Sequence, residues 1–192
     1  MDNKKERIIR AAIDVFKEKG IEKTKVSDIV KSAGIAQGTF YLYFPSKLAV
    51  MPSIAEEMVD RIIVAIKENV QKEDSFSDQL TQLIDVVFKV TDDYHEILAL
   101  IYAGLASSEH LKEWETIYKP FYSWMSTFLE GAKNNGSIRE SIHPDRTAKL
   151  LIGLIESAAE QIYLYDHSND QIVHTQKQEL IDFLSHALGT QN

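Results

Sequence analysis

The side chains with the clearest chemical use lie in a short segment between Gln37 and Tyr43. If this segment is helical, Phe40 and Phe44 share the face that packs inward. The groups left facing outward are an amide, a hydroxyl, two phenols and a leucine, from Gln37, Thr39, Tyr41, Leu42 and Tyr43. A glutamine amide can bond both edge atoms of adenine, and apolar groups can contact the thymine methyl. The segment therefore predicts recognition of base edges rather than covalent chemistry.

Lys47 adds a cation just beyond this segment, at the first turn of the next expected helix, and no carboxylate follows it until Glu56. A cation at this end opposes the helix dipole, at a cost of a few tenths of a kcal/mol. The free backbone N–H groups of the turn and the ammonium would suit an anion such as a DNA phosphate. The alternative is a solvated lysine, and the neighbouring recognition segment favours the phosphate.

No motif for catalysis, metals or cofactors is present. The chain has no Cys, which excludes disulfides, thiolate catalysis and Cys-based metal sites. None of the 6 His lies four residues from another on one helix, and neither a P-loop, a Gly-rich dinucleotide turn nor GxSxG occurs. We therefore expect no metal, no cofactor and no enzyme, although an all-α enzyme with acids assembled only in space stays an alternative.

Charge is divided unevenly along the chain. Residues 1–50 carry 10 basic and 6 acidic residues, whereas the rest carries 11 and 23, so the net charges are +4 and −12. A basic head on an acidic body indicates that one end of the protein meets phosphate. The N-terminus is charged and lacks an apolar signal core, and no apolar run reaches 18 residues, so we expect a cytoplasmic protein without a membrane span.

The apolar spacing is helical along nearly the whole chain and predicts an all-α fold of about nine helices. Three short helices end at Gly20, Gly34 and Pro45. Longer helices are expected at 46–71, 76–94, 96–106, 109–134, 145–166 and 171–188. We expect residues 1–46 to form a helix-turn-helix DNA-binding domain and residues 47–192 to form a helical bundle for ligand binding and dimerisation.

The segment 7–50 resembles the DNA-binding segment of the TetR family of bacterial regulators, most specifically in DIVKSAGIAQGTFYLYFPSK. The resemblance implies that Gln37, Thr39, Tyr41 and Leu42 face the groove, and that Thr24, Lys25, Tyr43 and Lys47 flank phosphates. We also expect Gly38 among the DNA-binding residues. Three positions depart from the common family pattern. Ala36 replaces a Ser N-cap, which should weaken the helix by about 1 kcal/mol. Gln37 stands where Lys is common, and Tyr43 where His is frequent.

The last two helices carry enough apolar residues to pack on two sides. The stretch from Ala148 to Tyr165 is apolar nearly all round, so it needs partners beyond one neighbouring layer. We expect a four-helix dimer interface, as in TetR-like regulators, built from Leu151, Leu154, Ala158, Ile162, Ile181, Leu184 and Leu188. A deep monomeric core is the alternative.

Aromatic residues crowd the middle of the chain and predict a ligand chamber. Tyrosine and tryptophan place polar groups in an apolar wall, which suits a hydrophobic or cationic ligand. We expect the chamber to be lined by Phe88, Tyr102, Tyr118, Phe121, Tyr122, Met125, Ile155, Glu156 and Ala159. Each ring taken singly also fits ordinary core packing. Glu156 and Glu160 could balance a cationic ligand or pair with a cation across a dimer.

Together these features predict a repressor that binds a palindromic DNA operator as a homodimer and releases it when a small molecule binds. An effector-free DNA-binding protein is the remaining alternative. The switch is expected to involve Pro52, placed beyond the first turn of the fourth helix, where it would bend or break the helix. A static bend, or a helix that starts again at Pro52, would explain the same residue.

Overall fold

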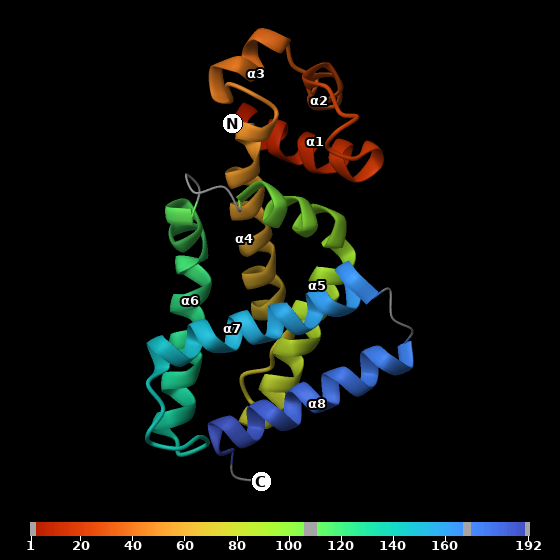
Figure 1. Cartoon of the computed structure of the whole chain (residues 1–192). Helices are drawn as coiled ribbons and strands as arrows, with labels where there is room; N and C mark the ends of the chain where they lie inside the picture. The colour runs from red at the N-terminus through yellow and green to blue at the C-terminus, as the bar shows by residue number, and fades with distance from the viewer. Residues whose placement is uncertain (1–2, 106–110, 167–169, 191–192) are drawn as a thin grey trace. The chain divides into compact units, whose positions relative to one another are not determined.

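A computed structural model describes residues 3–105, 111–166 and 170–190, except for the side chains of residues 100, 102–105, 111–112 and 166 (Figure 1). Within these ranges the chain forms helices and no strands. Two compact units can be separated: Met1–Met58 with Glu96–Ile117, and Val59–His95 with Tyr118–Asn192. The division predicted at residue 46 stays a prediction.

The described residues form eight α-helices. They are α1 (Lys4–Lys19), α2 (Val26–Ala33), α3 (Gln37–Tyr43), α4 (Met51–Asn69), α5 (Phe76–Leu105), α6 (Leu111–Asn134), α7 (Pro144–Glu160) and α8 (Asp170–Leu188). A short 3₁₀ turn, η1 (Leu48–Val50), precedes α4, and a π-helical turn, η2 (Gln161–Asp166), extends α7. The all-α prediction is confirmed, with about eight helices rather than nine.

The difference in number comes from α5, which spans the two helices expected at 76–94 and 96–106. Tyr94 has a non-helical backbone (φ −127°, ψ 18°) inside this helix, at the predicted break. Arg61 from α4 donates a hydrogen bond to the Tyr94 hydroxyl at 2.8 Å, and its guanidinium carbon lies 5.3 Å from the ring centroid. The sequence thus located the irregularity. The structure shows a kink within one helix, at which Tyr94 is bonded to Arg61, instead of a loop between two helices.

The placement of Pro52 differs from the prediction. Helix α4 begins at Met51, so Pro52 is its second residue and lies within the first turn. Proline is tolerated there because the first N–H groups of a helix have no intrahelical acceptor. Pro52 therefore marks where the α-helix starts after the 3₁₀ turn, which was the alternative interpretation of this residue.

The head is a small three-helix unit whose turns are closed by backbone caps. Phe16, Ile29 and Phe40 are fully buried in it. Gly34 ends α2 in the left-handed region (φ 63°, ψ 40°), which a residue with a side chain rarely adopts. Arg7 of α1 reaches the same end and donates to the carbonyls of Ala33 at 2.5 Å and Gly34 at 3.2 Å. A cation thus meets the negative end of α2.

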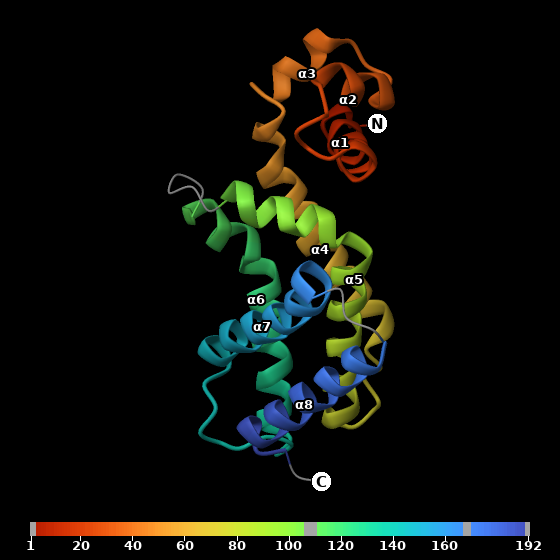
Figure 2. The ribbon, with the colours of Figure 1, turned by 45° about the vertical axis from the view of Figure 1, so that its right-hand side comes forward.

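In the second unit, α7 and α8 lie side by side in both views of the ribbon (Figures 1 and 2). Their inward residues, such as Ile152, Ile155 and Leu184, are buried together with Leu83 of α5 and Met125 of α6. This apolar core fixes the faces that α6 and α7 turn toward one another. None of the described helices combines the length and apolarity needed to cross a lipid bilayer.

We predict that Arg7→Ala lowers the free energy of unfolding by about 1–3 kcal/mol, because the charged hydrogen bonds to the end of α2 are removed. Urea unfolding followed by circular dichroism measures this change. Arg10→Ala is the matched control, since Arg10 is exposed and meets Glu6 only at 3.6 Å in a surface ion pair. Equal effects in the two variants would show that Arg7 does not cap α2.

Candidate functional site

Helix α3 carries an exposed surface that matches the predicted recognition face. Tyr41, Leu42 and Tyr43 expose 50%, 83% and 43% of their area. Gln37 is also exposed and Thr39 is half-buried, whereas Phe40 and Phe44 are buried at 0% and 4%. The inward and outward sides of α3 therefore agree with the prediction from helical spacing. An exposed leucine between two exposed tyrosines is an apolar surface available to a partner.

The start of α3 lacks a side-chain cap. Ala36 is the N-cap residue and makes no side-chain hydrogen bond to the helix. Phe40 is fully buried, with its ring 5.6 Å from the Tyr41 ring in an edge-on arrangement and 5.8 Å from the Phe44 ring. Burial of this ring stabilises α3 without replacing the hydrogen bond of a cap.

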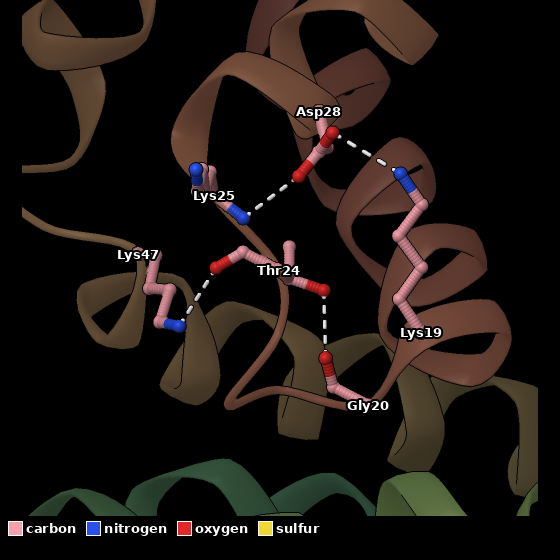
Figure 3. A network of polar contacts seen from close by, with 6 residues as sticks. All are labelled: Lys19, Gly20, Thr24, Lys25, Asp28 and Lys47. Carbon is pink, nitrogen blue, oxygen red and sulfur yellow. Dashed lines mark hydrogen bonds and ion pairs between the residues drawn. The ribbon is translucent and has the colours of Figure 1, made fainter.

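Lys47 is bound to the loop between α1 and α2, as Figure 3 shows for its bond to Thr24. Its ammonium donates to the carbonyl oxygens of Ile21 at 2.5 Å, Thr24 at 2.7 Å and Glu22 at 3.3 Å. The side chain is half-buried. Three acceptors match the three donors of an ammonium group. In this structure Lys47 closes the turn before α2 rather than presenting a free charge, and its contact with a phosphate stays a prediction.

Thr24 also has an internal role. Its side chain is 1% exposed and its hydroxyl donates to the Gly20 carbonyl at 2.7 Å (Figure 3). The hydroxyl is therefore turned into the loop and not toward a phosphate. Lys25, the next residue, is exposed and its ammonium makes no hydrogen bond among the described residues. Of the predicted flanking residues in this loop, Lys25 is the one whose charge faces solvent.

Asp28 fixes the first turn of α2. Its carboxylate accepts the backbone N–H of Lys25 at 2.9 Å and the ammonium of Lys19 at 3.1 Å (Figure 3). These two bonds, the backbone one first, lower the pKa of the Asp28 carboxyl below its usual value. Arg7, Lys19 and Asp28 are not among the residues predicted from the sequence. Only the Asp28 position carried a signal, because an acid at the third residue of a helix is typical of a capping box.

A second group of predicted residues meets between α6 and α7. The Tyr118 hydroxyl donates to the Glu156 carboxyl at 3.0 Å, and the Tyr118 and Tyr122 rings lie 5.7 Å apart. Lys149 of α7 lies over the Tyr122 ring, with its ammonium 4.9 Å from the centroid. Burial, and after it the neighbouring Glu160 charge, raise the pKa of Glu156 to about 8 despite the opposing bond from Tyr118. Glu156 is therefore mainly neutral at pH 7.

The other residues predicted to line the chamber are apolar and buried. Phe121, Met125, Ile155 and Ala159 expose at most 1% of their area and lie on the same two helices as the Tyr118–Glu156 pair. The side chain of Tyr102 lies outside the described residues. Phe88 is fully buried on α5, and its ring is bordered by Tyr163 and by the ammonium of Lys177 at 5.1 Å.

Comparison with known proteins identifies the family. Residues 8–54 match the family described as bacterial regulatory proteins, tetR family, and residues 80–188 match the tetracyclin repressor-like C-terminal domain. The chain belongs to the TetR family of transcriptional regulators. The family assignment confirms the resemblance seen in the helix-turn-helix segment and extends it to the second half of the chain.

Three similar proteins are informative about this TetR-family chain. An uncharacterized HTH-type transcriptional regulator of Bacillus subtilis, YvdT, is 42% identical over 187 residues, covering 97% of this chain and 96% of that protein. The fatty acid metabolism regulator protein of the same organism is 25% identical over 168 residues, covering 86% and 87%. The crystal structure of Bacillus subtilis FadR in complex with stearoyl-CoA has a TM-score of 0.74 at 24% identity, covering 93% and 96%, and shows the common fold. These relatives are named regulators, not enzymes.

The residues predicted to form the TetR-type dimer surface fall into two groups. Leu151, Ile162, Leu184 and Leu188 are at most 4% exposed within the chain itself, so they belong to its core and cannot form an outer surface. Leu154 is 38% exposed, and Ala158 and Ile181 are half-buried. The large apolar side chains that α7 and α8 do expose include Leu150 at 73% and Phe183 at 61%, neither of which was among the predicted interface residues.

The new role of Lys47 can be tested by comparison with Lys25. Lys47→Met keeps the apolar stem and removes the three bonds to the α1–α2 loop, so we expect it to lower the melting temperature. Lys25→Met removes an exposed charge and should leave the melting temperature within about 1 °C of the parent, as surface substitutions usually do. Differential scanning calorimetry measures both. A Lys47→Met protein as stable as the Lys25→Met protein would show that the bonds of Lys47 do not stabilise the α1–α2 loop.

The raised pKa of Glu156 predicts a pH-dependent stability difference. The unfolded chain releases this proton near the ordinary pKa of 4.5, whereas the folded chain keeps it up to about 8, so folding loses stability as pH rises between these values. Glu156→Gln keeps an acceptor for Tyr118 without the titration. Its melting temperature relative to the parent should therefore increase from pH 4.5 to pH 8.

Melting curves across this range test the effect. Glu130→Gln, at an exposed position on α6, is the control and should follow the parent at every pH. A constant offset between Glu156→Gln and the parent would mean that Glu156 is already ionised in the folded protein.

Proposed function

We propose that this TetR-family regulator is a repressor that binds a palindromic operator as a homodimer and releases it when a hydrophobic effector binds. The observation that supports this most directly is the exposed face of α3, where Gln37, Tyr41, Leu42 and Tyr43 are open to solvent while Phe40 and Phe44 are buried. Side chains of this kind on a recognition helix can contact base edges in the major groove.

Charge supports the same assignment. The first 50 residues have a net charge of +4 in a chain whose net charge is −8. Lys25, the residue before α2, is exposed, and its ammonium makes no hydrogen bond among the described residues. Contacts to phosphates place a protein on DNA without selecting sequence, whereas contacts to bases select it. We assign Lys25 to the first role and Gln37 to the second. Lys47 and Thr24 support the loop that carries Lys25.

The dimer is proposed to use the exposed apolar side chains of α7 and α8. Leu150, Leu154 and Phe183 lie on these helices and are open to solvent. Large apolar side chains that remain exposed on neighbouring helices are typical of protein interfaces. A dimer would also place two recognition helices on DNA, which pairs the symmetry of the protein with that of an inverted repeat.

The chemistry around Glu156 favours a hydrophobic effector over a cationic one. A neutral carboxyl cannot balance a cation until it loses its proton, and burial opposes that loss. The buried rings and methyl groups of α6 and α7 offer apolar contacts, and the Tyr118–Glu156 pair offers one polar position. A relative of the same fold is described in complex with stearoyl-CoA, so this thioester is the first effector to test.

The operator assignment is tested by selecting binding sites from a randomised duplex library and measuring affinity by fluorescence anisotropy. Gln37→Ala should reduce discrimination at one base pair per half-site by about 1–3 kcal/mol. Lys25→Met should weaken all sequences alike and make the dependence on salt less steep, by about 0.9 for each phosphate that is no longer neutralised. Gln178→Ala, an exposed glutamine on α8, should change neither quantity.

Further outcomes bear on the same assignment. Phe183→Asp should produce a folded monomer with strongly reduced operator affinity, as seen by analytical ultracentrifugation and anisotropy. Selection of no sequence by the parent protein, or an affinity independent of salt, would contradict the operator role. Release of bound operator by stearoyl-CoA would support the hydrophobic effector.

A further inference from the structure

A groove on the second unit lies apart from the predicted effector chamber. It has a volume of about 620 Å³ and is lined by residues of α4, of the α4–α5 loop, of α5 and of α6. The lining residues are Ile66, Lys67, Val70, Lys72, Gln79, Ser123, Trp124, Thr127 and Phe128. None of them belongs to the predicted effector set. A volume of this size fits a small organic ligand.

One wall of the groove is aromatic. The Trp124 and Phe128 rings stack with centroids 5.4 Å apart and planes at 12°, and Phe76 continues the stack 5.1 Å from Phe128. Trp124 is half-buried, and its indole N–H makes no hydrogen bond among the described residues. Every buried side-chain nitrogen or oxygen of the described residues has a hydrogen-bond partner. Because this N–H has none, it is not buried and can reach solvent. The wall thus offers a flat apolar surface and a free donor.

The charge of the groove is opposite to that of the body around it. Residues 51–192 carry a net charge of −12, yet the groove lining includes two lysines and no carboxylate. Lys67 and Lys72 are exposed and form no ion pair with any described residue. Two exposed cations in a lining without carboxylates attract an anion locally, against the negative net charge of the rest of this segment.

The loop that carries Lys72 is held in place by hydrogen bonds. Gln79 donates to the carbonyls of Lys72 at 3.1 Å and Asp74 at 2.8 Å. The carboxylate of Asp74 is itself occupied, because it accepts from the Gln82 amide at 2.7 Å. Gln79 of α5 therefore holds the backbone at Lys72 in place. The Asp74 carboxylate is bonded to Gln82, which also belongs to α5.

We propose that this groove binds an aromatic phosphate of mononucleotide size. The ring system would lie against Trp124, and the phosphate would be held by Lys67 and Lys72. An adenine ring has a π-face for stacking and a phosphate dianion matches two ammonium groups. This chemistry is shared by free nucleotides and by the nucleotide end of coenzyme A, and the two sources are separated below.

Tryptophan fluorescence tests the proposal in a Trp114→Phe background, which leaves Trp124 as the single tryptophan. Adenosine 5′-monophosphate should quench this emission in a saturable manner. Adenosine, which lacks the phosphate, should bind at least about tenfold more weakly, a difference of about 1.4 kcal/mol. Coenzyme A is titrated in parallel. Tighter binding than the monophosphate assigns the groove to coenzyme A, and equal or weaker binding assigns it to free nucleotides.

The lysines are tested by the double variant Lys67→Gln/Lys72→Gln, which should weaken binding of the monophosphate by about tenfold or more. Lys89→Gln is the matched control, because Lys89 is an exposed lysine of the same unit that pairs with Asp93 at 3.3 Å; its affinity should stay within about twofold. Calorimetric titration with Trp124→Leu checks the aromatic wall and should show reduced affinity. The proposal is overturned if the monophosphate gives no saturable signal, or if the double variant binds as tightly as Lys89→Gln.

Discussion

The three-helix head of this protein, formed by α1, α2 and α3, depends on two side-chain cations that donate hydrogen bonds to backbone carbonyls at its turns. Helices of 8 and 7 residues such as α2 and α3 are too short to be stable alone. Forming the first turn of a helix loses more free energy in backbone entropy than its one hydrogen bond contributes. Arg7 bonds the end of α2, and Lys47 bonds the loop that precedes α2. Between them they connect α1 and the segment just before η1 to the helix pair that carries the exposed face of α3.

This arrangement explains why a small apolar core suffices for the head. Phe16, Ile29 and Phe40 fill its centre, and the turn carbonyls that would otherwise need water are bonded inside the unit. Apart from the edge-on contact of Tyr41 with Phe40, the outward side chains of α3 then contribute little to the packing of the unit. Tyr41, Leu42 and Tyr43 are available for recognition because Phe40, Arg7 and Lys47 stabilise the unit elsewhere. In the second unit the Glu156 carboxyl is instead kept mainly neutral at pH 7, because burial raises its pKa to about 8.

Much of the fold followed from periodicity alone. The i, i+3, i+4 spacing located seven helices within a few residues, and the predicted interruption near residue 95 coincides with the non-helical Tyr94. Helical spacing also separated the inward Phe40 from the outward Leu42. These features are local, because the rotation per residue fixes which side chains share a face. The number of helices was overestimated because Tyr94 kinks α5 without ending it, with Arg61 bonded to its hydroxyl from α4.

The sequence by itself determined the helical class, the helix-turn-helix with its outward face, and the separation of a basic head from an acidic body. The tertiary structure decided which side chains are used internally. Lys47 meets carbonyls 23 to 26 residues away, and Thr24 turns its hydroxyl inward, neither of which a spacing rule can reveal. Leu151 and Leu184 lie in the core while Leu150 and Phe183 lie outside. When a helix is apolar on several sides, its sequence does not show which side packs against its own chain, because the neighbouring helices determine which side is buried.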